Sequence, residues 1–166
     1  MDIKIRLAKV EEREKIIQLQ SNSLRVLASK DYKPEQIESL VRSQAAVRFG
    51  SEVIFVAIYR EKIVGFASLL VNKLEIGGVY VNPEFSRQGI GSKLLEVVEN
   101  TAIEKGYKLI YVCSSLTAIK FYQKHGYRVY SNSANYGFFS EGKVWIPCKV
   151  LKKRLIEVEE KEGPIA

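Results

Sequence analysis

The residues best suited to chemistry form a turn that opens a helix. The turn reads Ser86-Arg87-Gln88-Gly89-Ile90-Gly91, and the apolar residues that follow recur at helical spacing. Glycine disfavours a helix by roughly 1 kcal/mol relative to alanine, and it is tolerated where the backbone bends sharply or approaches another group closely. Unpaired N–H groups and the positive end of the helix dipole can receive an anion at such a helix start. The turn therefore predicts an anion site, most simply for a phosphate.

Two common phosphate motifs do not fit this turn. A Walker loop needs Gly-Lys-Ser/Thr, whereas Gly91 is followed by Ser92-Lys93 in the opposite order. A dinucleotide fingerprint needs a third glycine where this chain has Leu94, and it follows the first strand of its fold rather than the fourth. For an isolated Gly-x-Gly, a purely structural turn is the alternative interpretation.

Three blocks in order resemble the GCN5-related N-acetyltransferase (GNAT) superfamily, across about residues 50–130. The turn is similar to that family's cofactor loop, Gln/Arg-x-x-Gly-x-Gly/Ala. The preceding "GGVYVNPEF" resembles the end of the family's fourth strand, and "AIKFYQKHGY" resembles its late helix. Ser86 departs from the usual first loop residue, so the resemblance implies that one side chain at the pyrophosphate is missing; Arg87 and Gln88 are candidates to compensate.

The resemblance implies that the chain binds acetyl-CoA and uses no metal. N–H groups of the turn would surround the pyrophosphate, and the fourth strand would offer backbone groups to the pantetheine arm in a V-shaped gap of the sheet, as an edge strand does to a peptide. Ser115 lies where the family often has an asparagine on this arm, although helix capping explains Ser114 or Ser115 equally well. The implied cofactor-binding residues are Val79, Tyr80, Val81, Arg87, Gln88, Gly89, Ile90, Gly91, Ser92 and Ser115.

Two side chains are candidates for proton transfer. By resemblance, Tyr122 would protonate the leaving thiolate, a step uphill by only about 2 kcal/mol for ordinary phenol and thiol pKa values; a packed core tyrosine is the alternative. Glu75 is the candidate base, and it shares the strand face of Val79 if the alternation is regular. A bulge at Gly77-Gly78 would break that alternation, a structural or solvent role is the alternative for Glu75, and attack by an already neutral amine needs no base.

The acceptor amine is expected between the first two helices and the last strands. Tyr32, Tyr136 and Phe138 either wall this site or serve only in packing. His125, the single histidine, is expected to interact with the C-terminus of its helix rather than to bind a metal, because no second histidine or cysteine cluster accompanies it.

One mixed α/β sheet would position these residues. Strands are expected at 3–8, 52–60, 62–72, 73–82 and 107–113, with Glu61-Lys62 as a hairpin turn and closing strands at 127–131 and 137–151. Helices are expected at 9–28, 34–48, from the glycine turn to about 105, and at 115–127. This order, β-α-α-β-β-β-α-β-α-β-β, resembles the GNAT fold. It predicts a single domain over residues 1–151 and a charged tail over 152–166.

Composition limits the remaining classes of function. The 166 residues contain no apolar run long enough for a membrane helix and no signal-peptide pattern. Cys113 and Cys148 lie far apart in sequence without a partner pair, which predicts reduced core thiols and a cytoplasmic protein. The charge of the tail cancels, so the net charge of +7 belongs to residues 1–151. With no nucleic-acid motif present, that charge favours capture of an anionic cofactor.

The expected function is therefore acetyl transfer from acetyl-CoA to a primary amine, carried by a small molecule or a peptide. The alternative is an acyl-CoA-binding or sensor module of the same fold with little turnover, and a nucleic-acid-binding protein is a third, weaker hypothesis. No partner other than the amine is expected, neither nucleic acid nor membrane. Dimers are common in the family, and the sequence leaves a monomer and a homodimer both open.

Overall fold

The computed structural model describes residues 1–130 and 135–156. Its elements follow the chain in the order β1 (Lys4–Leu7), α1 (Arg13–Leu27), α2 (Pro34–Val47), β2 (Glu52–Tyr59), β3 (Lys62–Leu70), β4 (Glu75–Val81), α3 (Ile90–Glu104), β5 (Leu109–Ser115), α4 (Ile119–Lys124), β6 (Arg128–Val129), β7 (Gly137–Ser140) and β8 (Val144–Arg154). Single turns of 3-10 helix precede α1, α3 and α4. The fold is the mixed α/β arrangement that the sequence predicts.

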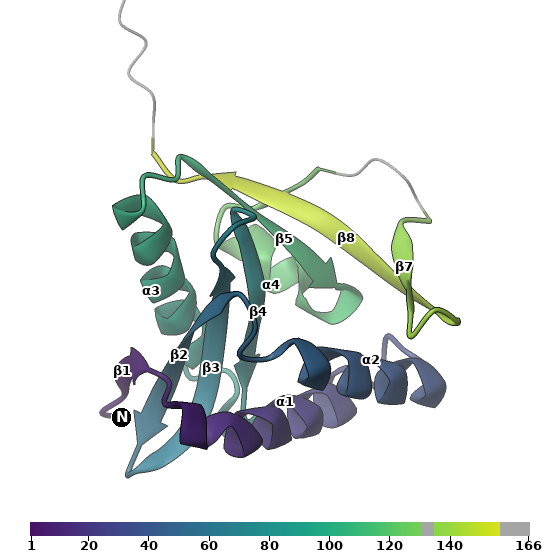
Figure 1. The fold of residues 1–166 in the computed structure, drawn as a ribbon, viewed down its shortest axis with the longest axis horizontal. Coiled ribbons are helices and arrows are strands. Elements are labelled where there is room, and N and C mark those ends of the chain that lie inside the picture. Colours follow the sequence, from purple (N-terminus) through teal and green to yellow (C-terminus); the bar gives the residue numbers. More distant parts are fainter. Residues whose placement is uncertain (131–134, 157–166) are drawn as a thin grey trace, which may run out of the picture.

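The strands form one sheet in the order β1-β2-β3-β4-β5-β8-β6, with β7 paired to the other end of β8. The β4–β5 pair is parallel, and the other pairs are antiparallel. In Figure 1 the sheet splits into two arms, because β1 to β4 run together while β5 and β8 leave at an angle. This division decides where a ligand can enter.

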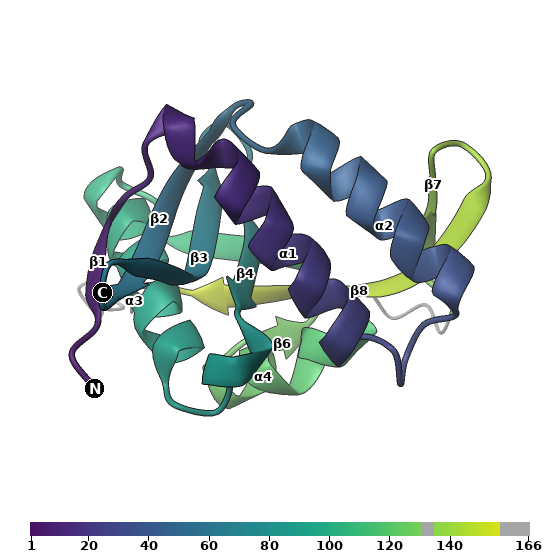
Figure 2. The same cartoon turned by 90° about the horizontal axis from the view of Figure 1, so that it is seen from below.

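Helices cover both faces of the sheet. Helix α3 packs on one face through Leu94, Leu95 and Val98, and the same cluster takes in Tyr122 of α4. Helices α1 and α2 lie side by side over the other face, as Figure 2 shows from below. Ile16 of α1 meets Val56 and Phe66 there. A separate apolar cluster joins the ends of α1 and α2 to β8 through Leu24, Leu40 and Ile146. The second arm thus packs against the helix pair on one side, and through Ile110, Val112 and Leu151 it belongs to the cluster of α3 and α4 on the other.

Three expected boundaries need correction. The two-residue turn between β2 and β3 is Arg60-Glu61, not Glu61-Lys62; both residues have positive φ (47° and 64°), as a tight turn between right-twisted strands requires. The chain closes with three strands rather than two, since the short β6 precedes the β7–β8 hairpin. Strand β8 runs to Arg154, past the expected start of the tail at residue 152, and residues 157–166 lie outside the described residues.

In the part of the chain that the structure describes, no helix combines the length and the apolar character needed to cross a bilayer.

Candidate functional site

The two arms of the sheet separate at the middle of β4. Strand β4 pairs with β5 only through Glu75 and Ile76, opposite Tyr111 and Val112. From Gly78 to Val81 it keeps its antiparallel partner β3 on one side, and no strand of the described residues pairs with it on the other. The backbone N–H and C=O groups on that side are free to bind an extended ligand, as in strand addition to a sheet edge.

A bulge at Gly77 turns the strand at the point of separation. Ser68 of β3 lies opposite Gly78, and the next residue, Leu69, lies opposite Ile76, so Gly77 is the extra residue. A Cβ atom on Gly77 would collide with the Ser68 hydroxyl. The buried guanidinium of Arg48 donates to the Gly77 carbonyl (3.2 Å) and to Ser68 Oγ (3.0 Å). This network requires glycine at position 77 and stabilises the bulge.

The glycine turn lies beside the free end of β4. The Ser86 hydroxyl donates to the Pro83 carbonyl (2.9 Å), so it closes the turn and is not directed at a ligand. Arg87 and Gly89 have positive φ values of 59° and 81°, and nothing lies within 4 Å of a Cβ built on Gly89. The N–H of Lys93 is the first in α3 to bond back, to the Gly89 carbonyl (3.1 Å). The preceding helical N–H groups therefore point out of the helix end, where an anion is stabilised.

The free strand edge and the turn line one cavity of about 480 Å³, called the larger cavity below. All of the predicted cofactor-binding residues line it except Gln88, which lies on the exposed side of the turn. The remaining walls come from the end of α1 and from α4 with the turn before it. Sequence reasoning assigned no ligand role to Phe121 and Lys124 of α4, which line the cavity there. The signal for Phe121 was the apolar stripe of α4, which is equally typical of core packing.

A second cavity of about 90 Å³, the smaller cavity, continues from the larger one. Both are lined by Leu24, Val79, Tyr80, Ser115 and Ala118, so the two spaces meet at the point where the strands part. Ser115 is the last residue of β5 and makes no side-chain capping bond to the following turn, contrary to the capping alternative. The smaller cavity lies between α1, α2, α4, β4, β5 and the β7–β8 hairpin. Apolar and aromatic residues line it together with polar ones, which include Gln44, Ser114 and Ser115.

Tyr122 lines the smaller cavity from α4 and is only 3% exposed. Its ring packs edge-on against Phe121 (5.2 Å between ring centroids) and Tyr127 (5.4 Å). Burial raises the pKa of the Tyr122 phenol above its ordinary value, and Tyr80 adds to the rise. The hydroxyl therefore keeps its proton at neutral pH and can donate it within the cavity.

Glu75 does not share a strand face with Val79, so that expectation is wrong. Glu75 is opposite Leu70 and Val79 is opposite Ala67, and because residues three apart on β3 face opposite ways, the bulge at Gly77 has reversed the alternation. Glu75 lies where β4 and β5 are still paired and lines neither cavity. Partial burial raises the pKa of its carboxyl.

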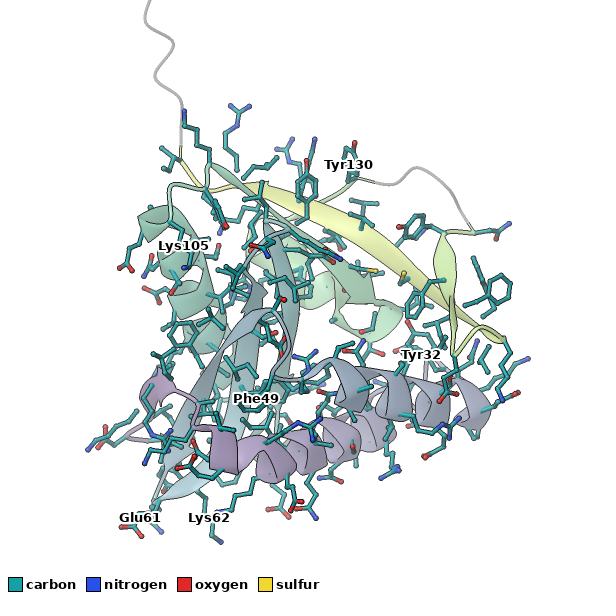
Figure 3. The ribbon with its side chains drawn as sticks, in the orientation of Figure 1. Tyr32, Phe49, Glu61, Lys62, Lys105 and Tyr130 are labelled. Atoms are coloured by element: carbon teal, nitrogen blue, oxygen red, sulfur yellow. The ribbon has the colours of Figure 1, made fainter. Side chains whose placement is uncertain are left out.

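The three predicted acceptor residues are placed differently from one another. Tyr32 lies between α2 and β8 (Figure 3), where its hydroxyl donates to the Pro147 carbonyl (2.6 Å) and accepts from the Leu116 N–H (2.9 Å). Burial raises the pKa of Tyr32 to about 12. Tyr32 and Phe138 both line the smaller cavity, whereas Tyr136 lies outside both cavities and is 39% exposed.

His125 connects the two helices that flank the turn. Its Nδ1 donates to the Phe121 carbonyl (2.8 Å), as expected near a helix C-terminus, and its Nε2 lies 2.9 Å from Ser92 Oγ in the first turn of α3. The ring also lines the larger cavity. Among the described residues, no group of three or more histidine, cysteine or acidic side chains could hold a metal ion.

Both cysteines are free thiols, as expected, but they are neighbours and only one of them lies in the core. Cys113 is exposed, Cys148 is buried, and their Sγ atoms are 3.2 Å apart. Both side chains line the smaller cavity. The pairing arises because β5 and β8 are neighbours, which the separation in sequence conceals.

Comparison with known proteins agrees with this arrangement. Residues 50–129 match the family model of the acetyltransferase (GNAT) domain. The spermidine N(1)-acetyltransferase of Thermoplasma acidophilum is 28% identical over 145 residues, which cover 78% of this chain and 90% of that protein. A GCN5-related N-acetyltransferase from Rhodopseudomonas palustris superposes with a TM-score of 0.84 at 23% identity, covering 93% of this chain and 96% of that one. The PaiA N-acetyltransferase of T. acidophilum, solved in complex with coenzyme A, gives a TM-score of 0.73 at 20% identity, with 93% and 99% covered.

Proposed function

Because the chain belongs to the GCN5-related N-acetyltransferase superfamily, we propose that it transfers an acetyl group from acetyl-CoA to the primary amine of a small molecule or peptide. One observation carries the proposal. The free edge of β4 and the glycine turn line the same cavity, and that cavity opens into a second one beside a buried tyrosine hydroxyl. A thioester and an amine can therefore approach one point from two sides.

The larger cavity fits acetyl-CoA in shape and in chemistry. N–H groups at the start of α3 would bind the pyrophosphate, each such hydrogen bond contributing about 1.5–3 kcal/mol, and the free edge of β4 would hold the pantetheine arm. Arg87 and Lys124 line the same cavity and add positive charge. The structurally similar PaiA N-acetyltransferase was solved with coenzyme A bound, which supports the same ligand here. Acetyl-CoA supplies the thioester carbonyl that the amine attacks.

The residues of the smaller cavity orient the amine and handle the proton. Apolar walls exclude water from the reacting groups, and the neutral Tyr122 hydroxyl donates to the leaving sulfur. The raised pKa of the phenol makes it a weaker acid than free tyrosine, but the same dry cavity also makes a thiolate more basic. The two shifts have the same sign, so they offset each other in the difference between the two pKa values, which decides the proton transfer. Glu75 is assigned no proton transfer, and the amine attacks in its neutral form.

Thermal unfolding tests the cofactor part of this proposal. With acetyl-CoA or CoA at about 100 times the dissociation constant, binding adds about 2.7 kcal/mol to the free energy of unfolding. For a chain of this size this corresponds to a rise in melting temperature of about 5–10 °C. ATP and NAD at equal concentration serve as controls. Equal stabilisation by ATP or NAD would contradict the assignment of a coenzyme A cleft.

A panel of amines tests the acceptor. The relative named as a spermidine acetyltransferase supports a small amine. None of the described residues lining the smaller cavity is acidic, however, and a polyamine needs carboxylates for its additional ammonium groups. We expect kcat/KM to be on the order of tenfold higher for a compact monoamine with an apolar or aromatic body than for spermidine, measured as acetylated product, because an unpaired buried charge is costly. A preference for spermidine would contradict this acceptor class.

The pH dependence tests the absence of an enzyme base. For an alkylamine acceptor, kcat/KM should rise about tenfold per pH unit from about pH 7 to 9, following the neutral fraction of the amine. Loss of the Tyr122 proton would end activity, and because burial raises its pKa, that loss falls above about pH 10. Glu75→Gln should give the same profile. If the slope of the wild type flattened at lower pH and Glu75→Gln altered it, the carboxylate would be the base after all.

A second function remains, an acyl-CoA-binding module with little turnover. The specific observation that favours it is the position of Glu75 outside both cavities, which leaves no carboxylate base among the described residues that line them. Such a module would show the same thermal stabilisation by acetyl-CoA. It would form no acetylated product with any amine of the panel.

A further inference from the structure

Two thiols lie together in the wall of the smaller cavity. Cys113 is opposite Val150 and Cys148 is opposite Ser115 in the antiparallel β5–β8 pair. The two cysteines are thus diagonal neighbours on one face of the sheet, and their Sγ atoms are 3.2 Å apart. Cys113 is exposed, whereas Cys148 is only 3% exposed. One sulfur can therefore meet a reagent from solvent while the other lies directly behind it.

The two thiols are in hydrogen-bond contact, so one S–H proton lies between the two sulfurs. Either sulfur can donate to the other across this contact. The contact and burial raise the pKa of Cys113, and the contact lowers the pKa of Cys148. Burial opposes the ionisation of Cys148, and the neighbouring Lys149 favours it. When the pair loses one proton, the remaining S–H stabilises the resulting thiolate. A thiolate is the form of cysteine that attacks disulfides.

We propose that Cys113 and Cys148 form a thiol-modification site of the acceptor cavity, at which a small disulfide such as glutathione disulfide converts the two thiols into one intramolecular disulfide. In the first exchange the shared proton lies on Cys148, and the exposed Cys113 sulfur attacks glutathione disulfide as a thiolate. A bond from Cys113 to one glutathione forms, and the other glutathione leaves and takes up the proton that the pair has lost, as a thiol. In the second, Cys148 attacks the Cys113 sulfur and releases the second glutathione. The protein loses two thiol hydrogens and two electrons, and the two glutathione thiols receive them.

The geometry favours closure of the second step. A disulfide bond is about 2.05 Å long, so the sulfurs at 3.2 Å need to approach by little more than one ångström. The approach draws β8 toward β5 at the cavity wall. The Cys148 N–H also donates to the Tyr136 carbonyl (3.1 Å), which links this movement to the segment that carries Phe138. Oxidation should therefore change the shape of the smaller cavity, while the larger cavity, which neither cysteine lines, keeps its form.

Peptide mapping tests the site without any assay of turnover. The full chain is incubated with glutathione disulfide or, as a control, reduced glutathione; free thiols are then alkylated and the peptides are identified by mass spectrometry. We expect a cross-linked Cys113–Cys148 peptide, with both thiols lost together. Cys148→Ser should stop at a stable glutathione adduct on Cys113, and Cys113→Ser should react far more slowly. A stable glutathione adduct on the wild type, or thiols that stay free, would overturn the proposal.

The effect of the disulfide on the cavity rests on the proposed function and is tested separately. In the oxidised chain, acetyl-CoA, which has no free thiol to reduce the disulfide, should still raise the melting temperature as in the reduced chain. The initial rate of amine acetylation, taken before released coenzyme A accumulates, should fall on the order of tenfold, because a misplaced acceptor loses its near-attack geometry. Dithiothreitol should restore it. The product is followed by chromatography, since thiol reagents would also report the cysteines. Full turnover of the oxidised chain would refute the change in the cavity; no turnover even when reduced would instead refute the proposed enzyme and leave the mapped disulfide standing.

Discussion

Replacing Tyr122 with phenylalanine is expected to lower kcat for amine acetylation by a factor of about 100 or more, the usual loss when a positioned acid is removed. The KM for acetyl-CoA should remain within about threefold, because Tyr122 lines the smaller cavity and not the larger one. The substitution deletes one oxygen and keeps the ring, so the contacts with Phe121 and Tyr127 are preserved. Steady-state kinetics with the acetyl-CoA and amine concentrations varied in turn would separate the two constants.

A neighbouring tyrosine provides the matched control. Tyr127 is as buried as Tyr122 and packs against its ring, but it lines neither cavity. Tyr127→Phe removes the same hydroxyl group from the same apolar cluster, and kcat should stay within about threefold of the wild type because no reacting atom is near. If Tyr122→Phe also kept its rate, Tyr122 would have only a packing role. If both variants lost activity together, the cause would be the stability of the cluster.

The glycine turn was predictable because its chemistry is local. A strand, a turn with two glycines and a helix follow one another within a few residues, so their relative position is fixed by the chain itself. Gln88 shows the limit of such reasoning. It belongs to the turn in sequence, yet it does not line the larger cavity, although its neighbours Arg87 and Gly89 do.

The direction of Glu75 could not be predicted from the same stretch. Gly77-Gly78 permits a bulge but does not require one. What stabilises the bulge is the Arg48 guanidinium, which reaches the Gly77 carbonyl from the end of α2, together with the Ser68 hydroxyl of β3, which leaves no room for a Cβ atom. These contacts depend on the tertiary fold, and one extra residue reverses every side chain before it.

The acceptor side depends on contacts of long sequence range in the same way. Tyr32 bonds to Pro147 between the helix pair and β8, and Cys113 meets Cys148 between β5 and β8 within the second arm. Such pairs cannot be predicted from a short motif, since each residue is of a type that is common in its own strand or turn. The sequence singled out the aromatic residues as a group, but it did not distinguish Phe138 in the cavity wall from Tyr136 outside it.

Replacing Gly89 with glutamate is expected to remove detectable stabilisation by coenzyme A, with an affinity loss on the order of 100-fold or more. The new carboxylate would stand at the start of α3, where it would compete with the pyrophosphate for the same N–H groups and repel its charge. Losing one or two charge-assisted hydrogen bonds costs about 3 kcal/mol, which corresponds to that factor. Thermal unfolding with and without coenzyme A measures the change. The protein itself should fold, because nothing lies within 4 Å of a Cβ atom at this position.

A control substitution at the opposite end of α3 distinguishes a loss of ligand binding from an effect of backbone strain. Gly106 follows α3 with φ of +87°, close to the +81° of Gly89, and a Cβ there would also meet nothing within 4 Å. Gly106→Glu therefore imposes a similar conformational cost and adds the same charge away from the larger cavity. It should lower the melting temperature about as much as Gly89→Glu while keeping the full shift with coenzyme A. Equal loss of that shift in both variants would mean that strain in α3 is responsible; an undiminished shift in Gly89→Glu would mean that the turn does not hold the pyrophosphate.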